Sequence, residues 1–283
     1  MDGGRLFAEQ AFHDKQAAER AKTFAQSPAM LSVDDDAYLD HESWIRPAFA
    51  KLGPLEGLRV LDFGCGHAMA SVVMARQGAK VTGFDLSRGY LAEAGERAAH
   101  NRVELGLVQA DGNRLPFATA SFDRIWGNAI LHHLDMPTAA SEIARVLVPG
   151  GHAVFCEPWG ENWLLRVARN RLWYSAKTRT VDEEPLREQD VDFFRSRFAK
   201  VEIQGFQLSS MVARIWGRRR WLTSLDRCDK FILDRIPGLR RYCRYVVLTL
   251  AQPRDFAFDV AGPIRTRQHG TTPPIRGACP SEA

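Results

Sequence analysis

Val60-Leu61-Asp62-Phe63-Gly64-Cys65-Gly66 decides the fold of this 283-residue chain, because an apolar strand runs directly into an acidic residue and two glycines. A helical segment near 67–77 follows. Gly64 and Gly66 carry no Cβ atom, so the backbone can turn tightly there and approach a ligand closely. This order of strand, glycine turn and helix predicts an adenine-nucleoside site, and the alternative is a tight turn without a ligand.

The side chains around the turn indicate which nucleoside it accepts. A dinucleotide site has a third glycine or alanine at the position of Met69, where close packing is needed. Asp62 lies two residues before Gly64, and its negative charge repels a pyrophosphate but suits an ammonium or sulfonium group. S-adenosylmethionine carries both cations and no phosphate, so we expect it as the cofactor.

With these residues the chain resembles the class I S-adenosylmethionine-dependent methyltransferases, whose first motif is an acidic residue followed by Gly-x-Gly-x-Gly. The third glycine is Ala68 here, a departure from the motif by a small residue at the methionine end of the pocket. The resemblance covers about residues 55–157. It implies cofactor contacts from Asp62, Gly64, Cys65 and Gly66.

A second acidic residue, Asp85, ends the next apolar stretch, Lys80-Val81-Thr82-Gly83-Phe84-Asp85. It follows the glycine turn by about 20 residues, the spacing at which this kind of fold places the ribose-binding acid. We therefore expect Asp85 to bind the ribose hydroxyls, with Leu86 beside the cofactor. The alternative is an acid that favours the N-terminus of the following helix.

A third strand ends at Asp111-Gly112-Asn113. The resemblance implies that Asp111 and its neighbours Gly112 and Asn113 hold the adenine of the cofactor. The alternative is a plain Asp-Gly turn.

The segment after the fourth strand, Trp126-Gly127-Asn128-Ala129-Ile130-Leu131-His132-His133-Leu134, is where the chemistry is expected, because ligands bind at the carboxyl ends of strands. It contains no Asn-Pro-Pro-Tyr, a signature of enzymes that methylate planar amino groups, which disfavours methylation of nucleic acid. We expect Asn128 to contact the cofactor or the acceptor.

Two adjacent histidines in this segment are candidates for the catalytic base. Ala-Ile-Leu-His resembles the corresponding segment of phosphoethanolamine methyltransferases, which implies His132 as the base. Leu-x-His is similar to quinone-biosynthesis O-methyltransferases, which implies His133 instead. Imidazole suits the task, because methylation of a hydroxyl releases a proton and an unperturbed imidazole titrates near neutral pH.

Strands near 58–63, 80–84, 104–109, 122–128 and 152–157 alternate with helices near 67–77, 87–100 and 138–147. This alternation predicts an α/β protein with a parallel sheet between helices. Strands at 201–206 and 245–250, a helix at 188–198 with Phe193, Phe194 and Phe198 inward, and a helix around 218–235 complete it. The resemblance implies a Rossmann-like, doubly wound seven-stranded sheet of order 3-2-1-4-5-7-6 with the last strand antiparallel.

The chain divides into three parts by pattern. Residues 1–50 predict an N-terminal helical lid over the cofactor, broken near Ser27-Pro28, with His13 on its surface or, alternatively, in the pocket. Residues 51–253 form the methyltransferase domain, with a Trp- and Arg-rich substrate-cap insertion at about 158–198. Residues 254–283 predict a disordered tail. Val148-Pro149-Gly150-Gly151 is expected as a turn before the fifth strand.

The composition indicates the cellular compartment and whether a metal site is expected. No apolar run approaches the ~20 residues of a membrane span, and the first residues lack the layout of a secretory signal. Five scattered cysteines, at 65, 156, 228, 243 and 279, form no metal motif and favour a reducing compartment. We therefore expect a cytoplasmic protein without a metal site.

Positive charge is concentrated in the second half. Residues 1–150 contain 15 basic and 19 acidic side chains, and residues 151–283 contain 23 and 15. The basic residues flank apolar helical stretches around 214–235. They favour an anionic acceptor, a peripheral membrane contact or a solvated face, and no nucleic acid partner.

Together these patterns predict O-methylation of a small molecule or lipid-like intermediate, assisted by a histidine. The Trp, Phe and Arg content of 159–221 suggests an acceptor with an apolar body and an anionic group. The alternatives are N- or C-methylation of a small molecule and a regulatory module that binds S-adenosylmethionine without catalysis. The oligomeric state is left open.

Overall fold

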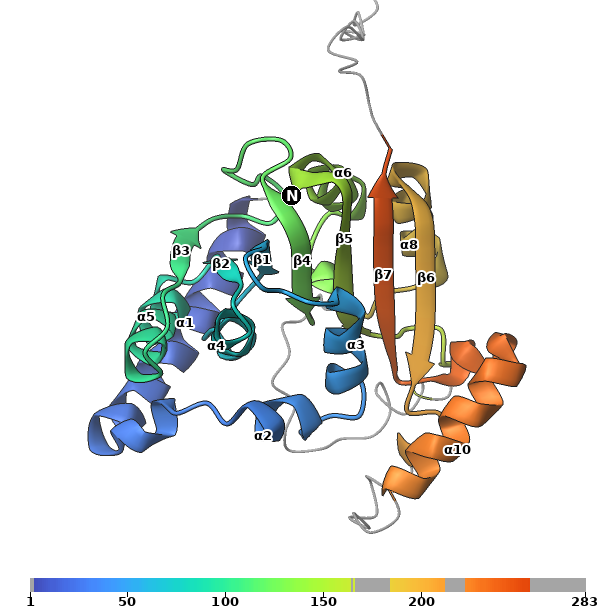
Figure 1. Ribbon diagram of the computed structural model, residues 1–283, viewed down its shortest axis with the longest axis horizontal. Coiled ribbons are helices and arrows are strands. Elements are labelled where there is room, and N and C mark those ends of the chain that lie inside the picture. The colour runs from blue at the N-terminus through green and yellow to red at the C-terminus, as the bar shows by residue number, and fades with distance from the viewer. Residues whose placement is uncertain (1–2, 164, 166–183, 212–221, 255–283) are drawn as a thin grey trace, which may run out of the picture.

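The computed structural model describes residues 3–163, 165, 184–211 and 222–254, and its centre is a seven-stranded sheet (Figure 1). The strands are β1 (Arg59–Phe63), β2 (Lys80–Asp85), β3 (Gly106–Gln109), β4 (Phe122–Asn128), β5 (Leu147–Pro158), β6 (Phe198–Phe206) and β7 (Tyr245–Pro253). Their order in the sheet is β3-β2-β1-β4-β5-β7-β6. The predicted sheet is confirmed.

The first five strands run parallel, and β7 lies antiparallel between β5 and β6. Parallel neighbours require crossover connections, which place helices on the faces of the sheet. The helices before β5 are α1 (Gly3–Gln26), η1 (Pro28–Leu31), α2 (Asp35–Asp40), α3 (Ile45–Leu52), α4 (Met69–Arg76), α5 (Arg88–His100), η2 (Leu131–His133) and α6 (Met136–Val146). After β5 come α8 (Glu188–Arg197), α10 (Leu222–Arg235) and η4 (Pro237–Tyr242).

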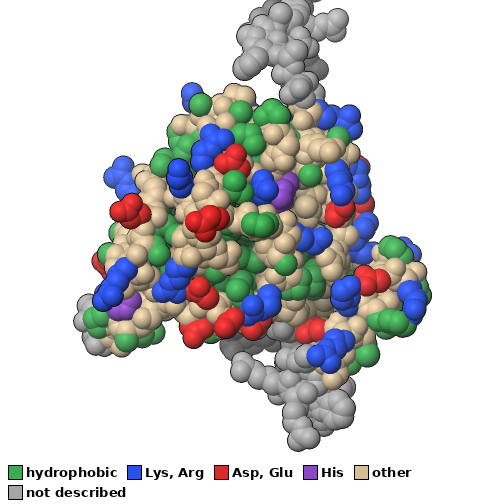
Figure 2. All heavy atoms as spheres, viewed as in Figure 1, with side chains coloured by type: hydrophobic (Ala, Val, Ile, Leu, Met, Phe, Trp, Pro, Cys, Tyr) green, Lys and Arg blue, Asp and Glu red, His purple; other side chains and the backbone are tan. Residues whose placement is uncertain are grey.

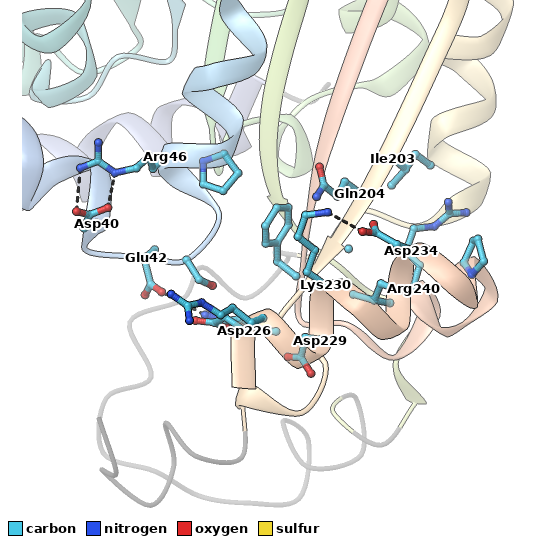
Figure 3. A pocket seen from close by; sticks show the side chains of 18 residues that line it. Asp40, Glu42, Arg46, Ile203, Gln204, Asp226, Asp229, Lys230, Asp234 and Arg240 are labelled. Atoms are coloured by element: carbon cyan, nitrogen blue, oxygen red, sulfur yellow. Dashed lines mark hydrogen bonds and ion pairs between the residues drawn. The ribbon is translucent and has the colours of Figure 1, made fainter. Parts of the chain in front are cut away.

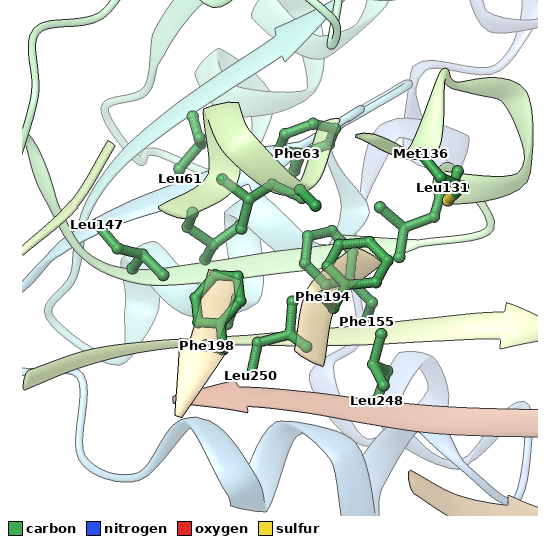
Figure 4. Close-up of a cluster of buried hydrophobic side chains, with 14 of the residues drawn as sticks. Leu61, Phe63, Leu131, Met136, Leu147, Phe155, Phe194, Phe198, Leu248 and Leu250 are labelled. Atoms are coloured by element: carbon green, nitrogen blue, oxygen red, sulfur yellow. The ribbon is translucent and has the colours of Figure 1, made fainter. Parts of the chain in front are cut away.

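Two apolar clusters fix the helices to the sheet. One joins the strands to α6 and α8, through residues such as Met136 and Phe194 (Figure 4). The other joins the strands to α3 and α4, through residues such as Phe49 and Val73. Because both faces of the sheet are buried, the central strands read as continuous apolar runs.

One side-chain orientation predicted for α8 is wrong. Phe194 and Phe198 are buried, as expected, but Phe193 is 40% exposed. Val191 and Phe194 lie three residues apart on one face of the helix, and Phe193 lies about 100° away from Phe194 around it, whereas Phe198 is the first residue of β6. Three phenylalanines so close in sequence cannot all face the same core.

The expected turn at 148–151 is part of β5 instead. Leu147 pairs with Phe122 and His152 pairs with Arg124, so the four residues between them form an irregularity within the strand. Gly150 has a φ of 81°, which a glycine adopts without strain. The Pro-Gly-Gly sequence therefore bends the strand and does not precede it.

The helix α1 is attached to α5 by polar contacts along its length. Asp14 accepts hydrogen bonds from the Ser87 hydroxyl and from the backbone N–H of Gly89, at the start of α5. Arg20 forms an ion pair with Glu93 at 2.8 Å. The helix ends at Gln26 and a 3-10 turn begins at Pro28, so the predicted break is confirmed.

Several predicted features lie outside the described residues. These are most of the cap insertion (166–183), the basic residues Arg214, Arg218, Arg219 and Arg220 with their neighbours Trp216 and Trp221, and residues 255–283 of the tail. The two described ends of the insertion meet, because Trp159 bridges to Leu186 and the Gly160 N–H donates to the Leu186 carbonyl. None of the described helices is long and apolar enough to span a bilayer.

The α8 phenylalanines give a matched test of the core. We expect Phe194→Ala to lower the free energy of unfolding by about 3–5 kcal/mol, since it removes a fully buried ring and leaves a cavity. Phe193→Ala removes the same atoms from an exposed position and should cost less than about 1 kcal/mol. Urea denaturation of both variants measures the difference, and equal losses would contradict the assigned helix orientation.

Candidate functional site

Two adjoining cavities lie where the carboxyl ends of β1, β2 and β4 meet. The glycine-loop cavity has a volume of about 620 Å³ and is lined by residues of the glycine turn, α2 and β4. The Asp85 cavity has a volume of about 160 Å³ and is lined by residues that follow β2, β3 and β4. Gly64, Gly66 and Tyr90 line both, so the two cavities form one cleft.

The glycine turn has the backbone conformation that its sequence predicts. Gly64 and Gly66 have φ values of 70° and 51°, in the left-handed region. A Cβ atom on Gly64 would lie 2.6 Å from the Ile130 side chain. Ala68, in place of the third glycine, is also left-handed at 63°, which costs roughly 1–2 kcal/mol for a residue with a side chain. The turn is thus held open to the cleft at some cost in stability.

Asp62 lies at the floor of the glycine-loop cavity. It is 3% exposed and accepts a 2.5 Å hydrogen bond from the Ser71 hydroxyl. Burial raises the pKa of this carboxyl to about 7, with a further rise from the nearby charge of Asp85. No lysine or arginine contributes to this shift. The site therefore contains a buried acid that a bound cation would ionise.

Asp85 lines the second cavity and also organises the turn. Its carboxylate accepts hydrogen bonds from the backbone N–H of Gly66 and of Ser87, both at 2.9 Å. The bond to Ser87 places it just before α5, so the helix-terminus alternative also describes its geometry. Leu86 lines the same cavity. The carboxylate joins the glycine turn to the end of β2 and faces the cleft.

Of the predicted adenine-binding residues that follow β3, two line the cleft and one supports them. Asp111 and Gly112 line the Asp85 cavity. Asn113 donates through its backbone and side-chain N–H groups to the Asp111 carboxylate and accepts from the Asp135 N–H. Asn113 does not line either cavity. Its geometry is that of a residue that holds Asp111 in place.

Asn128, at the end of β4, lines the glycine-loop cavity together with Cys65. Among the residues that the structure describes, the buried side-chain oxygen of Asn128 has no hydrogen-bond partner, and folded proteins rarely keep such an unsatisfied acceptor. Burial raises the pKa of the Cys65 thiol well above its usual value. The thiol therefore stays protonated and acts as a small, inert side chain in the loop.

His132 forms a buried pair with Glu157, a residue that the sequence patterns did not single out. Its Nδ1 atom lies 2.7 Å from Glu157 Oε2, and the other carboxylate oxygen accepts from the Ile130 and Leu131 N–H groups. Glu157 is fully buried and His132 is 9% exposed at its side chain. The signal was an acid at the carboxyl end of β5, beside the histidines that follow β4.

His133 has a different environment from His132, although the two ring centroids are only 4.2 Å apart. His133 lines the Asp85 cavity, together with Asp85 and Asp111. His132 lines neither cavity. His133 therefore lines the cleft that contains Asp85, and His132 is paired with a buried carboxylate.

The N-terminal segment contributes to both cavities. Tyr38 and His41, from α2 and its end, line the glycine-loop cavity. His13 of α1 lines the Asp85 cavity and lies 3.4 Å from the Tyr90 hydroxyl. The preferred surface position of His13 was therefore wrong and the alternative, in the pocket, is correct, because α1 is pinned along α5 with this face inward. The role of residues 1–50 as a lid stays a prediction.

A further cavity of about 790 Å³ lies away from the glycine turn (Figure 3). It is bounded by the start of α3, β6 and α10, and by ion pairs such as Arg46 with Asp40 and Lys230 with Asp234. None of the residues predicted to bind the cofactor lines it. Among the described residues, no cluster of three or more His, Cys, Asp or Glu side chains could hold a metal ion.

Comparison with known proteins agrees with this geometry. A family model described as a methyltransferase domain matches residues 61–155. The ubiquinone biosynthesis O-methyltransferase of Alkalilimnicola ehrlichii is 39% identical over 106 residues, which cover 37% of this chain and 43% of that protein. The demethylmenaquinone methyltransferase of Clavibacter sepedonicus is 34% identical over 142 residues, 49% of this chain and 55% of that protein. The chain thus spans about half the length of these curated relatives.

A solved structure supports the fold. Phosphoethanolamine N-methyltransferase 2 of Haemonchus contortus, in complex with S-adenosyl-L-methionine, superposes with a TM-score of 0.52 at 20% identity, covering 74% of this chain and 52% of that one. The matched domain contains the glycine turn and the strands that build the cleft. The family match and the observed strand order identify a class I S-adenosylmethionine-dependent methyltransferase domain within this chain, over residues 61–155.

Proposed function

We propose that the protein transfers the methyl group of S-adenosylmethionine to a hydroxyl oxygen of a small molecule or lipid-like intermediate, with His132 as the general base. The buried His132–Glu157 pair is the observation that carries this proposal. The name of the Alkalilimnicola ehrlichii relative, an O-methyltransferase, favours oxygen as the acceptor atom.

The residues of the cleft fit the cofactor. Asp62 and the unsatisfied oxygen of Asn128 line one cavity, where they would accept hydrogen bonds from the cofactor's ammonium group. Asp85, in the adjoining cavity, would accept from the ribose hydroxyls, and Asp111 and Gly112 would hold the adenine. The cofactor supplies an already activated methyl group. The protein's task is therefore to position the acceptor and to take its proton.

Glu157 orients His132 and sets its tautomer for proton transfer. Its carboxylate accepts the Nδ1 proton of His132, which fixes the tautomer in which Nε2 carries the lone pair. Within the described part of the chain, Nε2 has no hydrogen-bond partner and can take the hydroxyl proton. The imidazolium formed would lie 2.7 Å from a buried carboxylate, which stabilises it. This is the arrangement of an imidazole base oriented by a third group.

His133 is the alternative base. It lines the cavity with Asp85 and Asp111, so in this position it is suited to contact the nucleoside. The acceptor is proposed to have an apolar body and an anionic group, from the composition of 159–221. N- or C-methylation, and S-adenosylmethionine binding without catalysis, are the outcomes that the experiments below distinguish.

We expect Asp62→Asn to stabilise the free protein at pH 8. The folded pKa of Asp62, about 7, lies above the unfolded value of about 3.9, so the stability of the neutral form is lost as pH rises through about 7. Asn keeps an acceptor for Ser71 and avoids the buried charge, for a gain of roughly 2–4 kcal/mol at pH 8 that vanishes below about pH 4.

Urea denaturation at both pH values measures this effect, and titration calorimetry should show that the same variant binds S-adenosylhomocysteine at least about tenfold more weakly. The matched control is Asp123→Asn, because Arg59 lowers the pKa of that carboxyl. This control should lose stability at pH 8. A stability loss in both variants would contradict the assignment of Asp62.

We expect Asp85→Ala to weaken binding of S-adenosylhomocysteine by about 1–3 kcal/mol, through lost hydrogen bonds to a buried ribose. Asp85 also holds Gly66 and Ser87, so a general disturbance of the turn must be separated from the ribose contact. A 2′-deoxy analogue of the ligand does this in calorimetry. The wild type should discriminate against the analogue, and the variant should not; unchanged discrimination would reject the ribose role.

We expect His132→Ala to lower turnover roughly 100-fold or more with cofactor affinity nearly intact. Glu157→Gln should also lower turnover and preserve the thermal midpoint better than Glu157→Ala, because Gln can still accept from the Ile130 and Leu131 N–H groups. A cycle of single and double variants should show non-additive losses. Full activity of His132→Ala with an inactive His133→Ala would transfer the role to His133.

Finding the acceptor tests the reaction itself. Cells that express the protein and receive methyl-labelled methionine should accumulate a metabolite with the label on an oxygen, detected by mass spectrometry and NMR, and cells with His132→Ala should not. A label on nitrogen or carbon would replace O-methylation by one of the alternatives. Tight S-adenosylhomocysteine binding without any labelled product would favour the regulatory module.

A further inference from the structure

The outward face of α10 carries apolar and basic side chains together. Phe231 is 59% exposed, and Ile236, just beyond the helix, is 55% exposed. Arg227, Phe231 and Arg235 follow one another at intervals of four residues, so they share one face of the helix, and all three are exposed. We call Arg227, Phe231, Arg235 and Ile236 the outer patch.

The charge of this region is positive at its surface. Residues 222–244 contain six Arg or Lys side chains and three Asp side chains. Asp229 is 3% exposed and accepts hydrogen bonds from the backbone of residues 208–210, so it faces inward. Asp234 is paired with Lys230, and Asp226 is half-buried and lines the cavity beside β6. The exposed arginines at 227, 235, 241 and 244 therefore dominate, and Figure 2 shows basic and hydrophobic side chains side by side over α10.

Within the outer patch, a basic side chain and an aromatic side chain are in direct contact. The Arg235 guanidinium carbon lies 3.7 Å from the centre of the Phe231 ring, a cation–π contact in which the cation stays exposed. The other face of α10 supplies Asp229, Lys230 and Leu233 to the cavity beside β6, and Arg227 lies at the border of the outer patch because it also lines that cavity. Although Arg235 covers one face of the ring, Phe231 is still more than half exposed, so much of its apolar surface is left in water at a cost in hydration free energy.

We propose that the outer patch docks the protein on an anionic membrane surface. Arginines placed beside an exposed aromatic ring and an aliphatic side chain match the headgroup region of such a membrane, where the charges meet anionic lipid and the apolar groups enter the acyl boundary. None of the described helices could span the bilayer, so the contact is peripheral. The proposal is independent of the methyl transfer reaction.

The test uses the full chain and vesicle flotation. The protein should float with phosphatidylcholine vesicles that contain about one third phosphatidylglycerol, at about 0.05 M salt, and binding should fall several-fold at about 0.5 M salt. It should not float with phosphatidylcholine alone. Phe231→Ala combined with Ile236→Ala, and separately Arg227→Gln combined with Arg235→Gln, should each weaken binding to the anionic vesicles about tenfold or more.

Matched controls remove the same kinds of atoms elsewhere. Phe193→Ala removes another exposed ring, and Lys80→Gln combined with Lys200→Gln removes two exposed charges from strands of the sheet; both should leave vesicle binding unchanged. Equal losses in patch and control variants, or no flotation of the wild type at low salt, would overturn the proposal. So would a dimer, seen by analytical ultracentrifugation, that the Phe231→Ala and Ile236→Ala changes dissociate, because the patch would then belong to a second copy.

Discussion

The hydrogen bond from the Gly66 N–H to the Asp85 carboxylate is the interaction on which the cleft depends. It joins the turn after β1 to the end of β2, so the two strands present their ligand-binding groups at one edge of the sheet. The left-handed backbone at Gly64, Gly66 and Ala68 is tolerated because this bond and the packing of β1 hold it. A looser turn would fill the cleft with its own backbone and leave no room for a nucleoside.

Two buried carboxylates show how the protein keeps charge inside its core. Asp62 is hydrogen-bonded by Ser71 but has no cationic partner among the groups that shift its pKa, and that pKa is raised, so the free protein is destabilised until a cation arrives. Glu157 has two backbone N–H groups and an imidazole, which satisfy both its oxygens. The first arrangement suits ligand binding, since the ligand completes it. The second suits a permanent support for His132, because it is complete within the chain.

The sequence and the structure agree best where backbone geometry leaves little choice. The alternation of strands and helices, the glycine turn and the acid that ends β2 were predicted from pattern and spacing, because parallel strands must place their carboxyl ends at one edge, and Asp111, which follows β3, was expected from the family resemblance. Prediction failed where side-chain direction depends on a neighbour. Phe193 and Phe194 are adjacent residues of the same type, and they differ only in the face of α8 that they occupy. The Pro-Gly-Gly segment at 149–151 lies between two residues of β5 that pair with β4, so it forms an irregularity within the strand.

By itself the sequence determined the fold class and the position of the glycine turn at the end of the first strand, since both follow from local patterns of apolar, glycine and acidic residues. Only the tertiary structure decided which of the candidate residues line the cleft and which are held by other side chains. It brought Glu157 to His132 across two parallel strands, 25 residues apart in the chain, and it turned His13 into the cleft by pinning α1 to α5. Such contacts depend on which strands and helices become neighbours in space, and no pattern within a single segment contains that information.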